Sequence, residues 1–516
     1  MPSKNATVST VAVTISLKNL RSHAIKVRVS EKPFASRCGM RTKGNGMSLR
    51  SLIVAMALFA LVSCGGGGSG SSLDPPASVS TPTYLITGTI TEGATTGVSG
   101  VTVTLSGASS ASTVTDASGN YSFSGLGSGN YTMTPSLTGY TFSPADLAVT
   151  VTGADVTGQN FTATPPAAIQ LPKTGQTASY AADDDGAEQQ GVAWPNPRFT
   201  NNSDGTVSDN LTGLVWLKNA NCFGGSIWSA ALTHANTLAN GACGLTDGST
   251  VGQWRLPNVN ELRSLVDYSQ SNPPLPSGYP FTGVVSTGSY PYYWTSTTNP
   301  LDLGGALSIG MYAGDVYYWG TASSMYVWPV RSGQTTGTAQ VAQTGQTLCY
   351  DGNYHQIPCS GTGQDADKAA GAGWPSPRFT DNGNGTITDN LTGLVWLKNG
   401  NCFGTVATWG SALTDAVGLA SGACGLTDGS TAGQWRLPNV DELASLLTNE
   451  SQANVGTWLN SQGFSNAAGD FWSSSTYAIT PGNAWTIGGI YVTPNYNKNT
   501  PGIFLHVWPV RSQLAD

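Results

Sequence analysis

The sequence has few charged residues and very few histidines. Asp, Glu, Lys and Arg make up 10% of its 516 residues, and only four residues are histidine. Residues 1–63 hold 10 of the 22 Lys and Arg residues but only one of the 29 acids, which leaves 12 basic against 28 acidic residues, a net charge of −16. Clusters of Lys and Arg bind phosphate backbones, so this part of the chain is not expected to bind nucleic acid.

The sequence also lacks common signatures of catalysis and metal binding. It contains no CxxC pair, no GxSxG motif and no phosphate-binding glycine loop. Three of the histidines, His234, His355 and His506, lie beyond residue 63, but they are scattered along the chain. We therefore expect no enzyme activity and no metal site.

Residues 41–64 have the order of a secretory signal: basic residues, then the apolar run LIVAMALFALVSC, which is too short to span a bilayer. The run ends in LVSC, which resembles the bacterial lipobox, whose cysteine receives a diacylglycerol. The GGGGSGSS that follows has the composition of a flexible tether. We predict lipidation at Cys64, an over-extended start and signal peptide over 1–63, a tether over 64–82, and an outer-membrane or cell-surface location. An ordinary signal with an incidental cysteine is the alternative.

Two long stretches of the chain repeat each other. WPNPRFTNNSDGTVSDNLTGLVWLKNANCF at 194–223 returns as WPSPRFTDNGNGTITDNLTGLVWLKNGNCF at 374–403, and VWPVRS closes both stretches. Because the offset holds from end to end, we predict two complete domains, copy 1 at 170–333 and copy 2 at 343–513. Shared residues should build the common fold, and residues that differ should carry separate specificities.

The cysteines beyond residue 64 fall into local pairs, as expected for an exported protein. Each bridge could stabilise the fold by about 3 kcal/mol. We predict three disulfides that leave no free thiol in the mature chain: Cys222 with Cys243, Cys402 with Cys424, and Cys349 with Cys359.

The motif GQWRLPNVNEL at 252–262 returns as GQWRLPNVDEL at 433–443. Asn258 and Glu261 have the spacing of a capping box, and the apolar residues after them continue a helical face to Val266. An earlier helix is expected at 227–240 and again at 408–421. We interpret the motif as a structural joint in which Arg255 holds a carboxylate or carbonyl in the turn. Half of an active site is the alternative. The structural residues are Trp254, Arg255, Glu261, Trp435, Arg436 and Glu442.

Residues 83–163 alternate polar and apolar side chains with turn residues between the runs, which predicts a small β-sandwich. The ordered motifs GVTV, TDASGNYSF and GSGNY resemble carboxypeptidase-regulatory-like domains of the prealbumin type. We interpret this unit as a spacer.

The order GLVW, WRLPN, YWTST or FWSSS, and VWPVRS resembles the Lcl C-terminal domain family in both copies. The resemblance implies two α+β domains related to C-type-lectin-like folds, so the expected fold class is an all-β sandwich followed by two such domains. The family's name-giving member is a surface adhesin that recognises sulfated glycosaminoglycans. The resemblance therefore implies a non-enzymatic surface lipoprotein that binds a glycan or protein ligand, although the scarcity of basic residues does not favour a sulfated one.

The alternative function is catalytic, because the RLP element also resembles formylglycine-generating enzymes, which use a reactive cysteine pair. In addition, DNGNGTITD at 381–389 is somewhat like a calcium loop. Its counterpart NNSDGTVSD at 201–209 lacks the first acid, and both match a hairpin turn. We favour the hairpin and expect no cofactor, with Ca²⁺ as the weaker alternative.

In lectin-like folds the loops between the second helix and the last strands form the binding face, and here these loops differ most between the copies. Aromatic rings there could stack on sugars, with packing of the loops as the alternative role. The candidate ligand-binding residues are Tyr292, Tyr293, Tyr312, Tyr317, Tyr318, Trp319, Trp485, Tyr491 and Tyr496.

Overall fold

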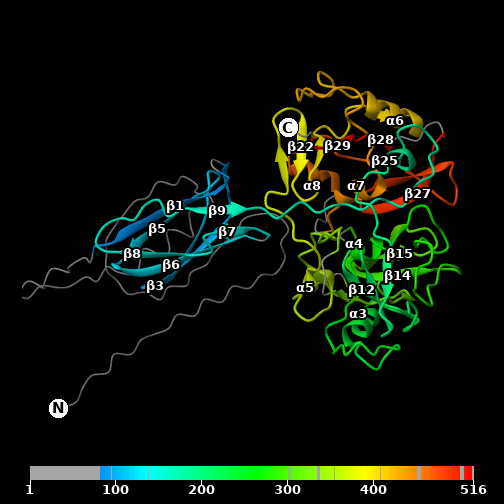
Figure 1. Cartoon of the computed structure of the whole chain (residues 1–516), viewed down its shortest axis with the longest axis horizontal. Coiled ribbons are helices and arrows are strands. Elements are labelled where there is room, and N and C mark those ends of the chain that lie inside the picture. The colour runs from blue at the N-terminus through cyan, green and yellow to red at the C-terminus, as the bar shows by residue number, and fades with distance from the viewer. Residues whose placement is uncertain are drawn as a thin grey trace, which may run out of the picture. The chain divides into compact units, whose positions relative to one another are not determined.

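The computed structural model describes residues 82–513, apart from 94–95, 138, 300, 303, 334–336, 354, 407, 450–454 and 500–504 (Figure 1). The predictions for Cys64, the signal peptide and nearly all of the tether lie outside the described residues. No helix in these described ranges is both long enough and apolar enough to cross a membrane.

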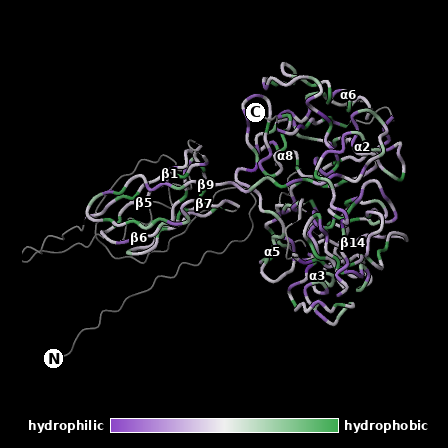
Figure 2. The backbone as a smooth tube through the Cα atoms, viewed as in Figure 1, coloured by the Kyte–Doolittle hydropathy of each residue, from purple (hydrophilic) through white to green (hydrophobic). Residues whose placement is uncertain are grey.

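The first described unit is a β-sandwich. Its strands are β1 (Tyr84–Glu92), β2 (Thr96–Gly97), β3 (Thr102–Gly107), β4 (Ala111–Val114), β5 (Asn120–Leu126), β6 (Gly129–Ser136), β7 (Thr141–Ser143), β8 (Leu147–Val151) and β9 (Phe161–Thr164). One sheet has the order β2-β1-β9-β7 with β5 on β1, and the other has the order β4-β3-β6-β8. Alternate side chains of both sheets form one core, and Figure 2 shows hydrophobic and hydrophilic residues along these strands. The predicted sandwich is confirmed.

Each copy has its own four-stranded sheet, in which the last strand of the copy pairs with strands from its start. In copy 1 its order is β10 (Phe199–Asn201), β11 (Thr206–Asp209), β12 (Leu214–Leu217) and β18 (Val330–Ser332). In copy 2 the order is β21 (Phe379–Asp381), β22 (Thr386–Asp389), β23 (Leu394–Leu397) and β29 (Val510–Ser512). The motifs GLVW and VWPVRS are therefore neighbours in space, and the predicted hairpins at 201–209 and 381–389 are confirmed.

A second, ten-stranded sheet runs through both copies in the described part of the chain. Copy 1 supplies β13 (Gly225–Ser226), β14 (Tyr292–Thr298), β15 (Gly305–Gly310), β16 (Val316–Gly320) and β17 (Met325–Tyr326), and copy 2 supplies β24 (Thr405–Val406), β25 (Asp470–Thr476), β26 (Asn483–Gly488), β27 (Tyr491–Asn497) and β28 (Leu505–His506). The order is β13-β17-β14-β15-β16-β27-β26-β25-β28-β24. The two halves have the same strand order, running outward from the centre. The copies meet at the centre, where Val316 pairs with Val492.

The helices are shorter than the sequence predicts. The first helix of each copy is α3 (Trp228–Thr237) or α6 (Trp409–Gly418), and the second is α4 (Val259–Arg263) or α7 (Val440–Ser445). After α4 the chain continues in tight turns, in which Leu265 and Val266 donate to carbonyls only three residues back, so both stay buried without a further helical turn. Copy 2 also has α8 (Val455–Ser461).

Each copy extends a segment onto the other. Arm 1 (residues 173–191) leaves and returns at the Pro172–Val192 bridge, and arm 2 (residues 343–371) does so at the Ala342–Ala372 bridge. Arm 1 contains α2 (Asp185–Glu188), and arm 2 contains β19 (Cys349–Tyr350), β20 (Gln356–Ile357) and α5 (Asp365–Lys368).

The contacts of the two arms are equivalent. Asp185 of arm 1 accepts a hydrogen bond from the Ser475 hydroxyl of copy 2 at 2.6 Å, and Asp365 of arm 2 accepts one from the Thr297 hydroxyl of copy 1 at 2.6 Å. Beside them, Gln176 accepts from the Thr476 amide at 3.0 Å, and Gln346 accepts from the Thr298 amide at 3.1 Å.

This exchange changes the predicted domain organisation. The boundaries 170–333 and 343–513 stay a prediction for the sequence repeat, but neither stretch is a self-contained domain. One hydrophobic core contains residues from both copies, including Trp328 and Trp508, and each copy's sheet is covered by the arm of the other. The repeat in the sequence could not reveal the exchange, because two equivalent acceptor strands are available to each arm.

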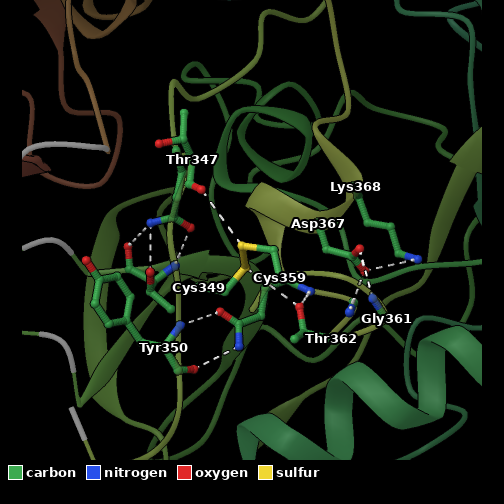
Figure 3. Close-up of a disulfide and its surroundings, with 12 residues drawn as sticks. Thr347, Cys349, Tyr350, Cys359, Gly361, Thr362, Asp367 and Lys368 are labelled. Carbon is green, nitrogen blue, oxygen red and sulfur yellow. Dashed lines mark hydrogen bonds and ion pairs between the residues drawn. A yellow bond between two sulfur atoms is a disulfide. The ribbon is translucent and has the colours of Figure 1, made fainter. Parts of the chain in front are cut away.

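All three predicted disulfides are present: Cys222–Cys243, Cys402–Cys424 and Cys349–Cys359. The third lies in arm 2, where copy 1 has no equivalent, and Figure 3 shows its surroundings. It closes the hairpin of β19 and β20. Gln364 accepts a hydrogen bond from the Tyr350 amide and donates one to the Tyr350 carbonyl. The disulfide thus braces the arm immediately before Asp365.

Candidate functional site

The aromatic side chains of β16 are placed by its pairing with β15. Val316 lies opposite Ile309 and is buried in the shared core, whereas Tyr317 lies opposite Ser308 and is 42% exposed. Successive residues of a strand point to opposite faces, so Tyr317 and Trp319 share the face that Val316 avoids. The sequence element VYYWG therefore presents a tyrosine and a tryptophan together.

Trp319 is surrounded by tyrosines of copy 1. The ring of Tyr290, 57% exposed, meets Trp319 edge-on at 5.1 Å, and the ring of Tyr317 lies 5.9 Å from that of Trp319. We call Tyr290, Tyr317 and Trp319 the aromatic row. Tyr290 belongs to the same aromatic loops that the sequence marks as the candidate binding face.

Tyr292 packs against Trp319 of the aromatic row, and Tyr312 packs against Tyr292. Tyr292 contacts Trp319 at 5.6 Å and Tyr312 at 6.1 Å, and its hydroxyl donates a 2.8 Å hydrogen bond to Asp315. Burial raises the pKa of Asp315 to about 6, and burial together with the charge of Asp315 raises the pKa of Tyr292. Tyr292 therefore remains a protonated donor that fixes the base of the row. Asp315 was missed by the sequence analysis, and its burial gave no local signal.

The row continues into copy 2. Tyr491 at the start of β27 lies 5.8 Å from Tyr317 and 5.8 Å from Tyr318, and Tyr317 and Tyr318 are 5.5 Å apart. We call Tyr317, Tyr318 and Tyr491 the tyrosine triad. Tyr318 and Tyr491 are half-buried. Candidate residues that the sequence placed in separate copies thus lie at one junction.

Two candidate ligand-binding residues are wrong. Tyr293 lies opposite Ile309, is fully buried, and its hydroxyl accepts a hydrogen bond from the Val285 amide at 2.8 Å. Trp485 is 1% exposed and packs edge-on against Tyr268 of copy 1 at 5.1 Å. Both side chains point into the shared core, so neither can stack on a ligand.

Tyr496 occupies a different setting. Its hydroxyl donates to Asp470 at 3.0 Å, and its ring lies 6.3 Å from that of Trp472, away from the aromatic row. The position equivalent to Tyr317 in copy 2 is Thr493, because Ser308 donates to the Tyr317 carbonyl as Thr486 does to that of Thr493. Copy 2 therefore lacks the counterpart of Tyr317, although Tyr496 lies opposite Ala484 as Trp319 lies opposite Ala306.

The WRLP element is built as a joint in both copies. Both terminal nitrogens of Arg255 contact the Glu261 carboxylate at 2.5 Å, and Glu261 also accepts from the Asn258 amide at 2.9 Å. Asn258 in turn accepts from the Glu261 amide, which completes the capping box. Trp254 is buried and donates to Ser249. Trp435, Arg436 and Glu442 repeat this arrangement, which is the geometry that the structural interpretation predicts.

Every arginine in the described ranges has an acidic partner within 3.8 Å. The pairs are Arg198–Asp209, Arg255–Glu261, Arg263–Asp441, Arg331–Asp247, Arg378–Asp389, Arg436–Glu442 and Arg511–Asp428. The first and last residues of the calcium-like stretch 381–389 also form ion pairs, Asp381 with Lys398 at 2.5 Å and Asp389 with Arg378 at 3.3 Å. Among the described residues, no group of three or more His, Cys, Asp or Glu could hold a metal ion.

The family assignment follows from the repeated framework. The model of the Lcl C-terminal domain matches residues 205–331 and 385–511. The chain carries two Lcl C-terminal domains. The model of the carboxypeptidase regulatory-like domain matches residues 85–164, which form the sandwich. The order of the three domains is the one the sequence predicts.

Similarities to individual proteins are short. The chain is 42% identical over 83 residues to chitinase ChiA of Flavobacterium johnsoniae, which is 16% of this chain and 5% of the chitinase. GBS52, the minor pilin of Streptococcus agalactiae, is 23% identical over 16% of this chain and 45% of the pilin, with a TM-score of 0.14. A streptococcal ancillary pilin is 17% identical over 19% of this chain and 38% of the pilin, with a TM-score of 0.16. The chain thus spans 5% of the chitinase and less than half of each pilin.

Proposed function

We propose that this protein is a non-enzymatic surface lipoprotein that binds neutral glycans through the aromatic row of its first Lcl domain. The observation that carries the proposal is the row itself. Tyr290 and Tyr317 expose 57% and 42% of their surface while touching Trp319, so three ring systems gather at one exposed place. Aromatic faces offer apolar contact to the C–H faces of sugar rings, and the hydroxyls beside them can bind sugar hydroxyls.

The charges of the molecule favour a neutral ligand. Sulfated or carboxylated sugars are bound best by arginine, whose planar guanidinium matches the anion. In the described chain each arginine already holds an acidic partner. Asp315, which accepts a hydrogen bond from the Tyr292 hydroxyl next to the row, is an acid. The site therefore differs from one suited to sulfated glycosaminoglycans.

Several features favour a binding role over catalysis at a surface location. The six cysteines of the described region all form disulfides, which leaves no reactive pair of the formylglycine-enzyme kind among them. Disulfides also fit an exported protein. The lipobox-like LVSC would anchor the chain at Cys64, and the sandwich would serve as a spacer between the anchor and the Lcl domains.

A glycan array probed with the full chain in detergent tests this function. We expect binding to neutral glycans, little binding to their sulfated forms, and a two- to tenfold loss of affinity in Tyr317→Thr, which installs the residue of copy 2. Tyr180→Thr is the matched control, because Tyr180 is 51% exposed but lies in arm 1. Equal losses in both variants, or preferential binding of sulfated glycans, would refute the proposal.

A further inference from the structure

We infer that the binding surface is shared by both copies, and that its ligand is an extended neutral glycan chain long enough to lie across the boundary between them. This inference rests on the proposed function and extends it from the aromatic row to the tyrosine triad. Copy 1 supplies Tyr317 and Tyr318 to the triad, and copy 2 supplies Tyr491.

The ring planes of the triad are closer to parallel than to edge-on. Their planes differ pairwise by 30°, 32° and 29°, and their centroids are 5.5 to 5.8 Å apart. In the protein core many ring pairs are edge-on, such as Phe281 and Trp328, whose planes meet at 89°. In the triad the rings are closer to parallel, so Tyr491 of copy 2 packs directly against the two tyrosine rings of copy 1.

Tyr317 belongs both to the triad and to the aromatic row. From Tyr290 through Trp319 and Tyr317 to Tyr491, each ring lies within 5.9 Å of the next. The exposed side chain of Leu301 in copy 1 also lies within 3.9 Å of the Cβ position of Gly489 in copy 2. The contact surface is therefore continuous and elongated, which suits a linear chain better than a single sugar.

The junction next to the triad is buried and hydrogen-bonded. Val316 pairs with Val492 and both are buried in the core that the copies share. Arm 1 and arm 2 tie each copy to the other's sheet through buried Asp185 and Asp365. Because the rings are held in place before binding, a ligand that touches both copies would not have to order them.

The consequence for recognition is dependence on chain length. A short sugar can cover the aromatic row of copy 1 alone, while a longer chain also gains the face of Tyr491. Each added aromatic contact increases affinity by about two- to tenfold. Affinity should therefore rise with length until the ligand reaches copy 2.

The test uses the full chain in detergent, titrated calorimetrically with chito-oligosaccharides and cello-oligosaccharides from the disaccharide to the hexasaccharide. Tyr491→Leu keeps an apolar side chain against the core but removes the ring, and Tyr491→Phe keeps the ring. For a series that binds, we expect Tyr491→Leu to lower the affinity for the hexasaccharide about two- to tenfold and to leave the affinity for the disaccharide unchanged. Tyr491→Phe should bind both sugars like the parent. Circular dichroism checks the fold of each variant.

The other outcomes separate this inference from the proposed function. If Tyr317→Thr weakens binding while Tyr491→Leu does not, or if affinity is independent of length, the site is confined to copy 1 and only the shared surface is overturned. If neither series binds and the array also yields no neutral glycan, the proposed function fails with it. If Tyr491→Leu does not fold, loss of the length dependence in Tyr318→Leu decides the question instead.

Discussion

Arg255 and Glu261 show how much a single buried pair can matter in this fold. Their side chains are 11% and 1% exposed, and the carboxylate also completes the cap of α4. By contrast, Lys398 and Asp381 form a pair of the same 2.5 Å length, but they are 37% and 41% exposed. Water screens the second pair, while removal of one member of the first leaves a buried charge without its partner.

We therefore expect Arg255→Ala to lower the free energy of unfolding by about 3 kcal/mol and Lys398→Ala to lower it by less than about 1 kcal/mol. Urea denaturation of both variants measures the difference. The double variant Arg255→Ala/Glu261→Ala should lose less than the sum of its two single variants, because it leaves no unpaired charge. Similar losses for Arg255→Ala and Lys398→Ala would mean that burial of the pair is unimportant.

The arms are the elements that turn two repeats into one structure, and each depends on a buried aspartate. Burial raises the pKa of Asp185 to about 7 and that of Asp365 to about 6, although hydroxyl groups donate to both. An unfolded aspartate titrates near pH ~4, so the folded protein binds the extra proton between that pH and its own pKa. Stability should therefore fall as the pH rises through this window and level off above it.

The melting temperature is thus expected to fall between pH 5 and pH 7. Asp185→Asn should remove the decline between about pH 6 and pH 7, where stability changes by up to ~1.4 kcal/mol per pH unit for one group. Asp365→Asn is the matched control, since it should reduce the slope only below about pH 6, where Asp185 and Asp315 still contribute to it. Calorimetry from pH 5 to pH 8 distinguishes the two variants. An unchanged slope in Asp185→Asn would show that its carboxyl does not titrate in this range.

At the scale of the whole molecule, the two Lcl domains behave as an internal pair with twofold-like symmetry. Equivalent strands of the two copies follow in the same order from either edge of the ten-stranded sheet. The shared core includes Phe281 and Trp328 of copy 1 with Phe464 and Trp508 of copy 2. The surface that each arm covers would be exposed in a single copy. Exposed apolar area of this kind favours association with an equivalent partner.

A fragment of residues 164–333 should consequently form a homodimer in which each arm 1 lies on the other molecule. Thr297 of copy 1 can donate to Asp185 as Ser475 does in the intact chain. Sedimentation equilibrium measures the mass, and the same fragment with Asp185→Ala and Gln176→Ala should shift toward monomer. A stable monomer of the unaltered fragment would contradict the interdependence of the copies.

The sequence by itself determined the features that depend on residues close together in the chain. The capping boxes follow from the Asn258–Glu261 spacing, the hairpins from their turn residues, and the disulfides from local pairs of cysteines. The sandwich follows from alternation along its strands. These features were predictable because short-range geometry alone fixes their partners.

Only the tertiary structure decided which rings are exposed and which copy each segment completes. Tyr292 and Tyr293 are adjacent in sequence, yet one supports the aromatic row and the other is in the core, because strand alternation depends on a register set by β15. Tyr317 and Tyr491 meet because β16 and β27 pair across 174 residues, and the arms could have covered either copy. Such contacts are chosen by the packing free energy of the whole molecule, which no local pattern contains.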